Sequence, residues 1–457
     1  MQTVALRMIV EREAEIRGFE SVEYWTVDAL LEAAGRTPFG ARLVRWRGED
    51  VPWKKNGAGP ARPADGTGRN GNGRNGKIPA LPSAAAAQEV VEHCNGARFV
   101  VTGIEAKRSK RNPPPPFTTS KLQQEAARRF RLPVSRTMRL AQNLYEGKDL
   151  GPLGTVGLIT YMRTDSTRVA AEALDAVRGF IGETYGADYL PGDPRYFRQS
   201  KSAQDAHEAI RPTSLDLPPE KVEQHLDRDE LNLYRLIWTR FVASQMTAAE
   251  FDVTTVEVTA GDACFRATGE VQRFPGWLAV YQETREEDAE DKPEASLSLP
   301  PLEERETLAA LAVDAEQNFT QPPPRFTEAM LVRALEENGI GRPSTYAAIL
   351  GVLAEKDYVD KIEGRLKPTD LGEIVVGLLV KHFGDIFDVA YTARMEEELD
   401  RVENGDEKGA LDAATAELAR AQANLEKVEA GARAEERAVA EADAALAGRE
   451  LKHAEAG

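Results

Sequence analysis

The chain has 457 residues, of which 42% are hydrophobic and 29% are charged; this balance is typical of globular proteins and excludes wholesale disorder. At roughly 150 residues per domain, the length predicts about three domains. The formal net charge of −17 argues, taken alone, against nucleic-acid binding, and two cysteines, Cys94 and Cys264, are too few for a four-cysteine zinc site or a disulfide scaffold.

Charge is distributed unevenly along the sequence. Residues 36–139 contain 21 Lys or Arg and 7 Asp or Glu, a formal charge of +14, whereas residues 283–316 carry −9. One basic region among acidic neighbours is typical of a nucleic-acid footprint that the net charge conceals. A solvated surface of mixed charge is the alternative.

The first elements alternate between helix and strand. Apolar residues at helical spacing predict a helix over residues 1–18, and residues 22–31 have strand character. The Gly/Asn-rich stretch 56–77 lacks core-forming side chains, so we expect a flexible loop. Its G-x-G-x-x-G and Walker-like spacings do not lie between a strand and a helix, and we attribute them to chance.

The middle of the chain begins with a stiff proline run at residues 113–116. A helix follows, with Ser120 as its expected N-cap. Residues 157–162 resemble a short buried strand, and residues 164–186 predict a long amphipathic helix that opens directly after it. Further helices are expected over residues 135–145 and 228–246.

Period-two alternation begins at about residue 247 and predicts a hairpin or meander, interrupted by an acidic loop at residues 283–294. Thr327 and Ser344 are the expected N-caps of two later helices. A hairpin around Glu363 and another helix complete a winged-helix-like unit.

The last fifty residues are rich in Ala and Glu. One apolar position recurs every seven residues there, at Leu411, Leu418, Leu425, Ala432, Val439 and Leu446. This pattern favours a long, weakly packing helix; a coiled coil that assembles partners is the alternative.

The densest polar cluster beside an apolar run is TYMRTDST, residues 160–167. On a strand, Tyr161 and Arg163 would point to the same face. A strand end that opens into a helix can hold a phosphate, because N–H groups and an arginine converge there. A tyrosine hydroxyl could then attack a phosphodiester while Arg163 stabilises the developing charge. A core tyrosine beside an exposed arginine is the alternative.

Three long motifs, GLITYMRTDST, AHEAIRPT and FTEAMLVRALEENGIGRPSTYA, together resemble the type IA DNA topoisomerases, in particular the bacterial topoisomerase I branch. The resemblance runs in family order from residue 2 to about residue 404. It implies transient cleavage of one DNA strand and passage of another without ATP, which relaxes negatively supercoiled DNA.

The resemblance also implies roles for individual residues. Tyr161 would attack the DNA backbone and form a 5′-phosphotyrosyl link, and Arg163 would hold the scissile phosphate. His207 would belong to the active-site hydrogen-bond network, with Asp165 as its orienting partner. The single-strand groove would include Arg342, Ser344 and Thr345 of the GRPST motif. Because Ser344 and Thr345 are expected to open a helix, its N-terminus would favour phosphate.

The family's Toprim domain has no counterpart here, and the resemblance assigns to it a catalytic lysine, a glutamate general acid and the Mg²⁺ ligands. We therefore expect Mg²⁺ for the family but no ligands for it in this chain, and neither zinc nor ATP. The family's C-terminal zinc-binding or basic repeats are also missing. We expect a fragment, a truncated gene product or half of a split enzyme. The alternative function is a catalytically incomplete clamp for single-stranded DNA that needs Toprim in trans.

The expected fold class is a multidomain α and β clamp. Its expected parts are a helical base domain at residues 1–25 and 319–404, a β-rich arch at 26–117 and 248–318 with the disordered loop 56–77, a lid carrying Tyr161 at 118–247, and a helical tail at 405–457. The expected partners are single-stranded segments of negatively supercoiled DNA and a separate Toprim-containing chain. No run of 18 apolar residues is present, so no membrane is expected. We expect a cytoplasmic, nucleoid-associated monomer.

Overall fold

The computed structural model describes residues 1–51, 81–198, 207–282 and 299–403 apart from residue 385, together with short helical pieces between residues 415 and 449. The expected loops 56–77 and 283–294 and most of the heptad tail lie outside the described residues. Within the described ranges, no helix is long and apolar enough to cross a membrane.

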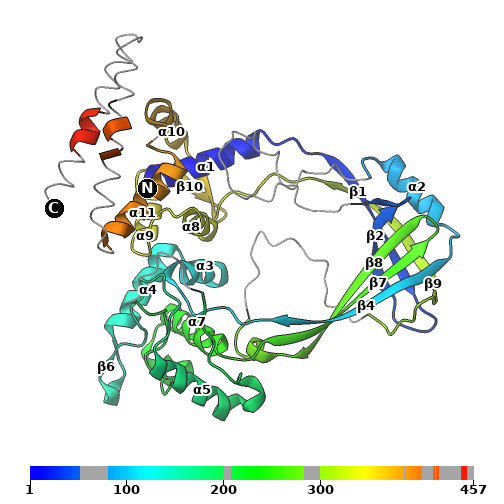
Figure 1. Cartoon of the computed structure of the whole chain (residues 1–457), viewed down its shortest axis with the longest axis horizontal. Coiled ribbons are helices and arrows are strands. Elements are labelled where there is room, and N and C mark those ends of the chain that lie inside the picture. Colours follow the sequence, from blue (N-terminus) through cyan, green and yellow to red (C-terminus); the bar gives the residue numbers. More distant parts are fainter. Residues whose placement is uncertain are drawn as a thin grey trace, which may run out of the picture.

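The described elements form three groups arranged as a ring (Figure 1), and each group surrounds its own hydrophobic core. The base comprises α1 (Gln2–Arg17), α8 (Glu328–Glu337), α9 (Tyr346–Glu355), β10 (Val359–Ile362), β11 (Arg365–Pro368), α10 (Asp370–Phe383) and α11 (Val389–Glu403). The lid comprises α3 (Thr119–Phe130), α4 (Val134–Glu146), β5 (Lys148–Asp149), β6 (Thr155–Val156), α5 (Ala171–Tyr185), α6 (Pro219–Val222) and α7 (Arg228–Ser244). The arch comprises β1 (Glu23–Glu32), β2 (Phe39–Trp46), β3 (Glu49–Asp50), α2 (Ala84–Cys94), β4 (Phe99–Arg111), β7 (Ala249–Ala260), β8 (Ala263–Phe274) and β9 (Thr307–Phe319).

The arch is an antiparallel sheet whose strand order, in the described part of the chain, is β1-β9-β4-β7-β8-β2-β3. Strand β1 also pairs with β2, so the sheet closes on itself at the end far from the helical groups. Strand β4 pairs with β9 at Phe99 and Val100, whereas its pairing with β7 continues to Arg111. Two ribbons therefore leave the closed end: β1 and β9 lead to the base, and β4, β7 and β8 lead to the lid (Figure 1).

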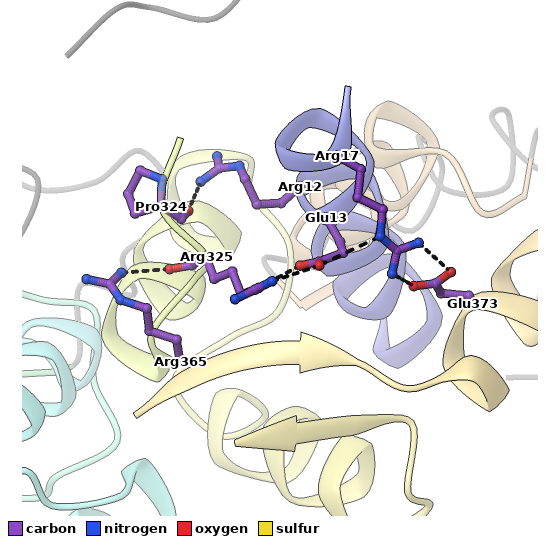
Figure 2. Close-up of polar contacts among 7 residues, drawn as sticks. All are labelled: Arg12, Glu13, Arg17, Pro324, Arg325, Arg365 and Glu373. Atoms are coloured by element: carbon purple, nitrogen blue, oxygen red, sulfur yellow. Dashed lines mark hydrogen bonds and ion pairs between the residues drawn. The ribbon is translucent and has the colours of Figure 1, made fainter. Parts of the chain in front are cut away.

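Ion pairs fix the base around the root of the arch, one of them to a buried carboxylate and one of them exposed (Figure 2). Glu13 of α1 is only 3% exposed and accepts hydrogen bonds from Arg325 Nε and Nη2 at 2.7 and 2.9 Å. Arg17 donates to both carboxylate oxygens of Glu373 on α10, at 3.0 and 2.6 Å. The backbone N–H of Val22 donates to Thr320 Oγ1 at 2.8 Å. The chain segments that enter the arch at β1 and leave it after β9 are therefore both held beside helix α1.

The lid closes against the base along helices α3 and α8. Glu336 of α8 accepts from Ser120 Oγ and from Gln124 Nε2, the latter at 3.4 Å, and lies 3.6 Å from Lys121 Nζ. Glu328, at the N-terminal end of α8, accepts from the backbone N–H of Val134 at 2.8 Å. The prediction that Ser120 caps α3 is wrong, because Thr118 is the N-cap and accepts from the backbone N–H of Lys121.

Candidate active site on the lid

Tyr161 lies on an irregular, extended segment rather than at the end of a strand. Residues 157–162, all of them described, form only an isolated bridge between Ile159 and Pro212, so the prediction of a buried strand is wrong. The backbone N–H of Leu158 donates to the carbonyl of Leu144 at 2.8 Å, and that of Thr160 to the carbonyl of Arg211 at 2.9 Å. The backbone N–H groups of this apolar segment thus bond to two separate neighbouring segments and not to a single adjacent strand.

The side chains of this segment nevertheless alternate between core and surface. Met162 and Thr164 are buried, whereas Tyr161 is 44% exposed, Arg163 is exposed and Asp165 is half-buried. Tyr161, Arg163 and Asp165 therefore share one side of the segment. The Tyr161 and Arg163 side chains on this side are exposed to solvent.

The start of α3 fixes the backbone on both sides of Arg163. Thr119 is fully buried, and its Oγ1 donates to the carbonyl of Met162 at 2.7 Å and accepts from the N–H of Thr164 at 2.8 Å. The N–H of Thr119 donates in turn to the carbonyl of Thr164 at 2.8 Å. The extended segment is thereby held in one conformation without belonging to a sheet.

Helix α5 begins at Ala171, so the prediction of a helix opening at TDST is wrong. The hydroxyls of Thr164 and Ser166 each accept from a backbone N–H two residues further on, at 3.0 and 3.1 Å. Such local bonds compete with helix formation and favour turns and extended backbone. The N-terminus of α5 therefore lies ten residues along the chain from Tyr161, and does not supply the phosphate site expected directly beside it.

The AHEAIRPT segment brings His207 next to Tyr161. The N–H of Ala209 donates to the carbonyl of Arg168 and that of Ile210 to the carbonyl of Phe117, both at 2.8 Å. The ring centroids of Tyr161 and His207 lie 6.4 Å apart, and Tyr145 packs edge-on against Tyr161 at 5.4 Å. The structure thus places the tyrosine and the histidine of two distant motifs together.

Asp165 links this lid cluster to the base. Burial raises the pKa of its carboxyl above the ordinary value. A hydrogen bond from its own backbone and then the positive charges of Arg342 and His207 act in the opposite direction, and Asp400 adds to the rise. The interaction with Arg342 shows that the GRPST loop of the base lies close to the lid segment. Asp165 and His207 of the lid and Arg342 of the base thus lie near one another at the boundary between lid and base.

Arg342 is held by α11, an element that the sequence analysis did not assign. Its Nε and Nη2 donate to the two carboxylate oxygens of Asp400 at 3.0 and 2.7 Å, and Nη2 also donates to the carbonyl of Glu396 at 2.9 Å. The buried Glu396 carboxylate accepts from the N–H of Gly341 at 3.1 Å. Acidic residues four apart, as Glu396 and Asp400 are, lie on one face of a helix, and this spacing is the signal that could have found them.

The expectation that Ser344 caps the next helix is wrong, because α9 begins at Tyr346 and Thr345 is its N-cap. The hydroxyl of Thr345 accepts from the N–H of Arg342 at 2.8 Å and donates to its carbonyl at 3.1 Å. A turn from Arg342 to Thr345 therefore delays the helix by one residue. The Thr345 hydroxyl is engaged in shaping the GRPST loop.

The described residues do not form a Mg²⁺ site. No group of three His, Cys, Asp or Glu in these ranges is arranged to hold a metal ion. The carboxylates of Glu396 and Asp400 are paired with Arg342, and Glu208 is paired with Arg211 at 2.8 Å.

The closed arch, the helical lid with its exposed tyrosine and the helical base define the clamp of a type IA topoisomerase. A family profile described as DNA topoisomerase matches residues 1–410. The chain therefore belongs to the bacterial DNA topoisomerase family.

Two curated relatives illustrate this membership. DNA topoisomerase 1 of Xylella fastidiosa strain 9a5c and that of strain Temecula1 are each 43% identical over 412 residues, which is 89% of this chain and 48% of the relative. Full-length topoisomerase I from Thermotoga maritima superposes with a TM-score of 0.71 at 32% identity, covering 88% of this chain and 59% of that one. The chain thus spans about half the length of the curated relatives it matches.

Proposed function

We propose that this chain is the clamp part of a type IA DNA topoisomerase, which cleaves one DNA strand transiently and passes another through the break. The observation that carries the proposal is the exposed Tyr161 beside Arg163 and His207 in a chain of this family. DNA, in its single-stranded segments, is the proposed substrate. We place the protein in the cytoplasm at the nucleoid, as a monomer.

Tyr161 acts as the nucleophile. Its hydroxyl oxygen attacks a backbone phosphorus, a bond forms to the 5′-phosphate, and the bond to the 3′-oxygen of the preceding nucleotide breaks. The phenol loses its proton and the 3′-oxygen gains one. Arg163 neutralises charge on the phosphoryl oxygens, and Arg342 and Thr345 position the strand. Reversal restores the phosphodiester without ATP, because the phosphotyrosine ester conserves the bond energy.

The complete reaction requires groups that we assign to a Toprim-containing chain in trans. These are a general acid for the 3′-oxygen and the ligands of Mg²⁺. A positioned general acid contributes roughly two to four orders of magnitude to a rate. We therefore expect no relaxation of supercoiled plasmid by this chain alone, and partial relaxation after a matching Toprim segment is added.

Tyr161→Phe tests the assignment of the nucleophile. It removes the attacking oxygen, so relaxation and the covalent DNA adduct should both vanish in the reconstituted system. Tyr145→Phe is the matched control, because Tyr145 packs against Tyr161 and a phenylalanine ring preserves that contact. Activity that survives Tyr161→Phe, or is lost equally in the control, contradicts the assignment.

The second candidate function is a clamp that binds single-stranded DNA and does not cut it. Both functions require tighter binding of single-stranded than of duplex oligonucleotides, with affinity falling as salt rises. A Toprim supplement that produces neither adduct nor relaxation would leave the binding clamp as the function.

A further inference from the structure

The most exposed large hydrophobic side chain among the described residues is that of Tyr196, at 80%. It lies on the lid, in the irregular segment that follows α5 and the short helical turn Ala187–Tyr189. A single exposed aromatic ring is ordinary on a protein surface. Two features distinguish this one: the backbone beside it is fixed, and the arginines around it lack acidic partners.

The residues directly after α7 fix the backbone beside the ring. The side chain of Gln245 is fully buried; its Oε1 accepts from the N–H of Arg195 at 2.9 Å and its Nε2 donates to the Arg195 carbonyl at 3.0 Å. Arg195 Nε donates to the carbonyl of Met246, a lid core residue, at 2.9 Å. This anchor lies where the lid continues into β7 of the arch (Figure 1). Tyr196 is therefore presented from a fixed point, which lowers the entropy that binding would cost.

The arginines around this segment bond to carbonyl oxygens and not to carboxylates. Arg178 of α5 donates through Nη2 to the carbonyls of Pro191 and Gly192 at 2.9 and 3.0 Å, and its Nη1 is buried without a hydrogen-bond partner. Burial lowers the pKa of the Arg195 guanidinium, and no acid offsets that effect. Arg198 is exposed, and among the described residues none of these three arginines forms an ion pair. Because a carbonyl cancels no charge, this edge of the lid carries uncompensated positive charge.

The ring and one of these cations share a surface. Exposure alternates along the segment: Arg195 and Phe197 are half-buried, whereas Tyr196 and Arg198 are exposed. Residues two apart on extended backbone point to the same side. The one acid of residues 191–198 is Asp193, which is exposed and pairs with neither arginine.

An aromatic ring beside unpaired guanidinium groups suits single-stranded nucleic acid. An unstacked base covers the ring, and the phosphates of the strand meet the cations. A duplex keeps its base faces inside the stack and would offer this surface only phosphate.

We propose that this edge of the lid is a contact site for single-stranded DNA, in which one nucleobase stacks on Tyr196 and a neighbouring phosphate is bound by Arg198. Arg178 and Arg195 attract the strand through their charge. The inference rests on the proposed function in its choice of ligand. The site belongs to the same group of helices as Tyr161, so a strand bound there is held by the lid and not by the base.

Fluorescence anisotropy of a labelled oligothymidylate bound to the full chain tests the ring. Tyr196→Ala should weaken binding about ten-fold, the order of loss expected for one stacked base, and Tyr196→Phe should bind as wild type does. Phe383→Ala is the matched control, because Phe383 is a 43% exposed ring at the end of α10 in the base. An abasic oligonucleotide of equal length has the same charge and no base to stack, so wild type and Tyr196→Ala should bind it equally.

A salt series tests the cation. Arg198→Gln should reduce the log–log salt slope by about 0.7, the share of one phosphate contact on a single strand. Arg198→Lys keeps the charge and should retain most of the slope. Arg305→Gln is the charge control, because Arg305 is an exposed arginine of the arch, just before β9; its slope should equal that of wild type.

Tyr196→Trp adds a spectroscopic readout of stacking. Oligothymidylate should quench the additional tryptophan emission relative to wild type, and the abasic strand should not. Wild-type protein that binds no single-stranded DNA would overturn the proposed function itself. Wild-type binding with unchanged affinity in Tyr196→Ala, or equal weakening of the thymidylate and abasic strands by that variant, would overturn the stacking site alone.

Discussion

Asp165 experiences opposing influences at the boundary between lid and base. Burial raises the pKa of its carboxyl, and a hydrogen bond from its own backbone together with the charges of Arg342 and His207 offsets that rise only in part. A carboxyl whose pKa is higher in the folded than in the unfolded protein stabilises the fold at low pH and loses that contribution as pH rises through the folded pKa. At neutral pH the ionised side chain therefore costs stability.

Asp165→Asn should consequently raise the melting temperature at neutral pH. The gain should shrink as the pH falls toward the ordinary carboxyl pKa near 3.8, where wild type is protonated too. Thermal melts of both proteins between pH 3.5 and pH 7.5 measure this difference. A variant that is less stable than wild type at pH 7 would show that the backbone hydrogen bond and the attraction to Arg342 and His207 outweigh burial.

The identity of individual helix N-cap residues was the feature that the sequence predicted least well. Hydroxyl-bearing residues stand next to one another at Thr118–Ser120 and at Ser344–Thr345, so composition alone cannot select the N-cap. The partner of each hydroxyl decides: Thr119 bonds to Met162 and Ser120 to Glu336, both far along the chain, whereas Thr345 bonds to the backbone of Arg342, three residues before it. By contrast, Thr327 has no competing hydroxyl beside it, and its prediction as an N-cap is confirmed.

Among the elements, helices α3 and α8 are joined by the carboxylate of Glu336, which bonds to several lid residues. Glu336→Gln removes the charge that attracts Lys121 and weakens the bonds from Ser120 and Gln124. Because the side chain is partly exposed, the closed state should lose only about 1 kcal/mol relative to an open one. Energy transfer between dyes on the lid and the base should show a larger open fraction.

Exposed Glu355 at the end of α9 offers the control, since Glu355→Gln changes the same net charge away from the contact. Dyes can be attached to introduced cysteines because both natural cysteines are buried, and burial raises the pKa of the Cys94 thiol to about 11. Equal open fractions in wild type and Glu336→Gln would show that apolar packing alone closes the lid.

The junction of α1 with the arch predicts a pH dependence of the opposite sign. Hydrogen bonds from Arg325 hold the pKa of Glu13 below its ordinary value near 4.5, against the effect of burial. A lowered folded pKa stabilises above the unfolded pKa, and that contribution is lost as pH falls through the folded value. Glu13→Gln should therefore be less stable than wild type by about 1–2 kcal/mol at pH 7, and the gap should close below pH 4.5. Urea unfolding at each pH provides the measurement, and a constant gap would contradict the role of the charge.

Elements with strong periodicity were predictable, and those without it were not. The amphipathic helices α1, α4, α7 and α10 and the hairpin β7–β8 match the sequence expectations. Strand β9 was missed, because most of its residues are exposed on a two-stranded ribbon and its hydrophobic alternation is weak. Helix α2 was missed as well, since its alanine-rich face gives little contrast with the neighbouring segment.

For the whole molecule, the family resemblance supplied what local patterns could not, namely that residues 1–18 and those after Thr327 build one base. The domain boundaries remain a prediction.

Deletion of residues 57–76 tests whether the fold of the arch depends on this stretch. Since loop closure costs only about 0.6 kcal/mol per doubling of length, the free energy of unfolding should change by less than about 1 kcal/mol. A loss of several kcal/mol in chemical denaturation would show that this stretch contributes to the folded core.

The closed end of the arch has a kinetic consequence. Lid and base remain tethered through it when their own contact breaks, because the strand pairing among β1, β2 and β8 does not involve the lid. Reclosure is then an intramolecular, first-order event whose rate does not depend on protein concentration. Under the proposed function, a DNA end held by the lid would return to the base on the same polypeptide, so the two ends of a cleaved strand would not have to find each other by diffusion through solution.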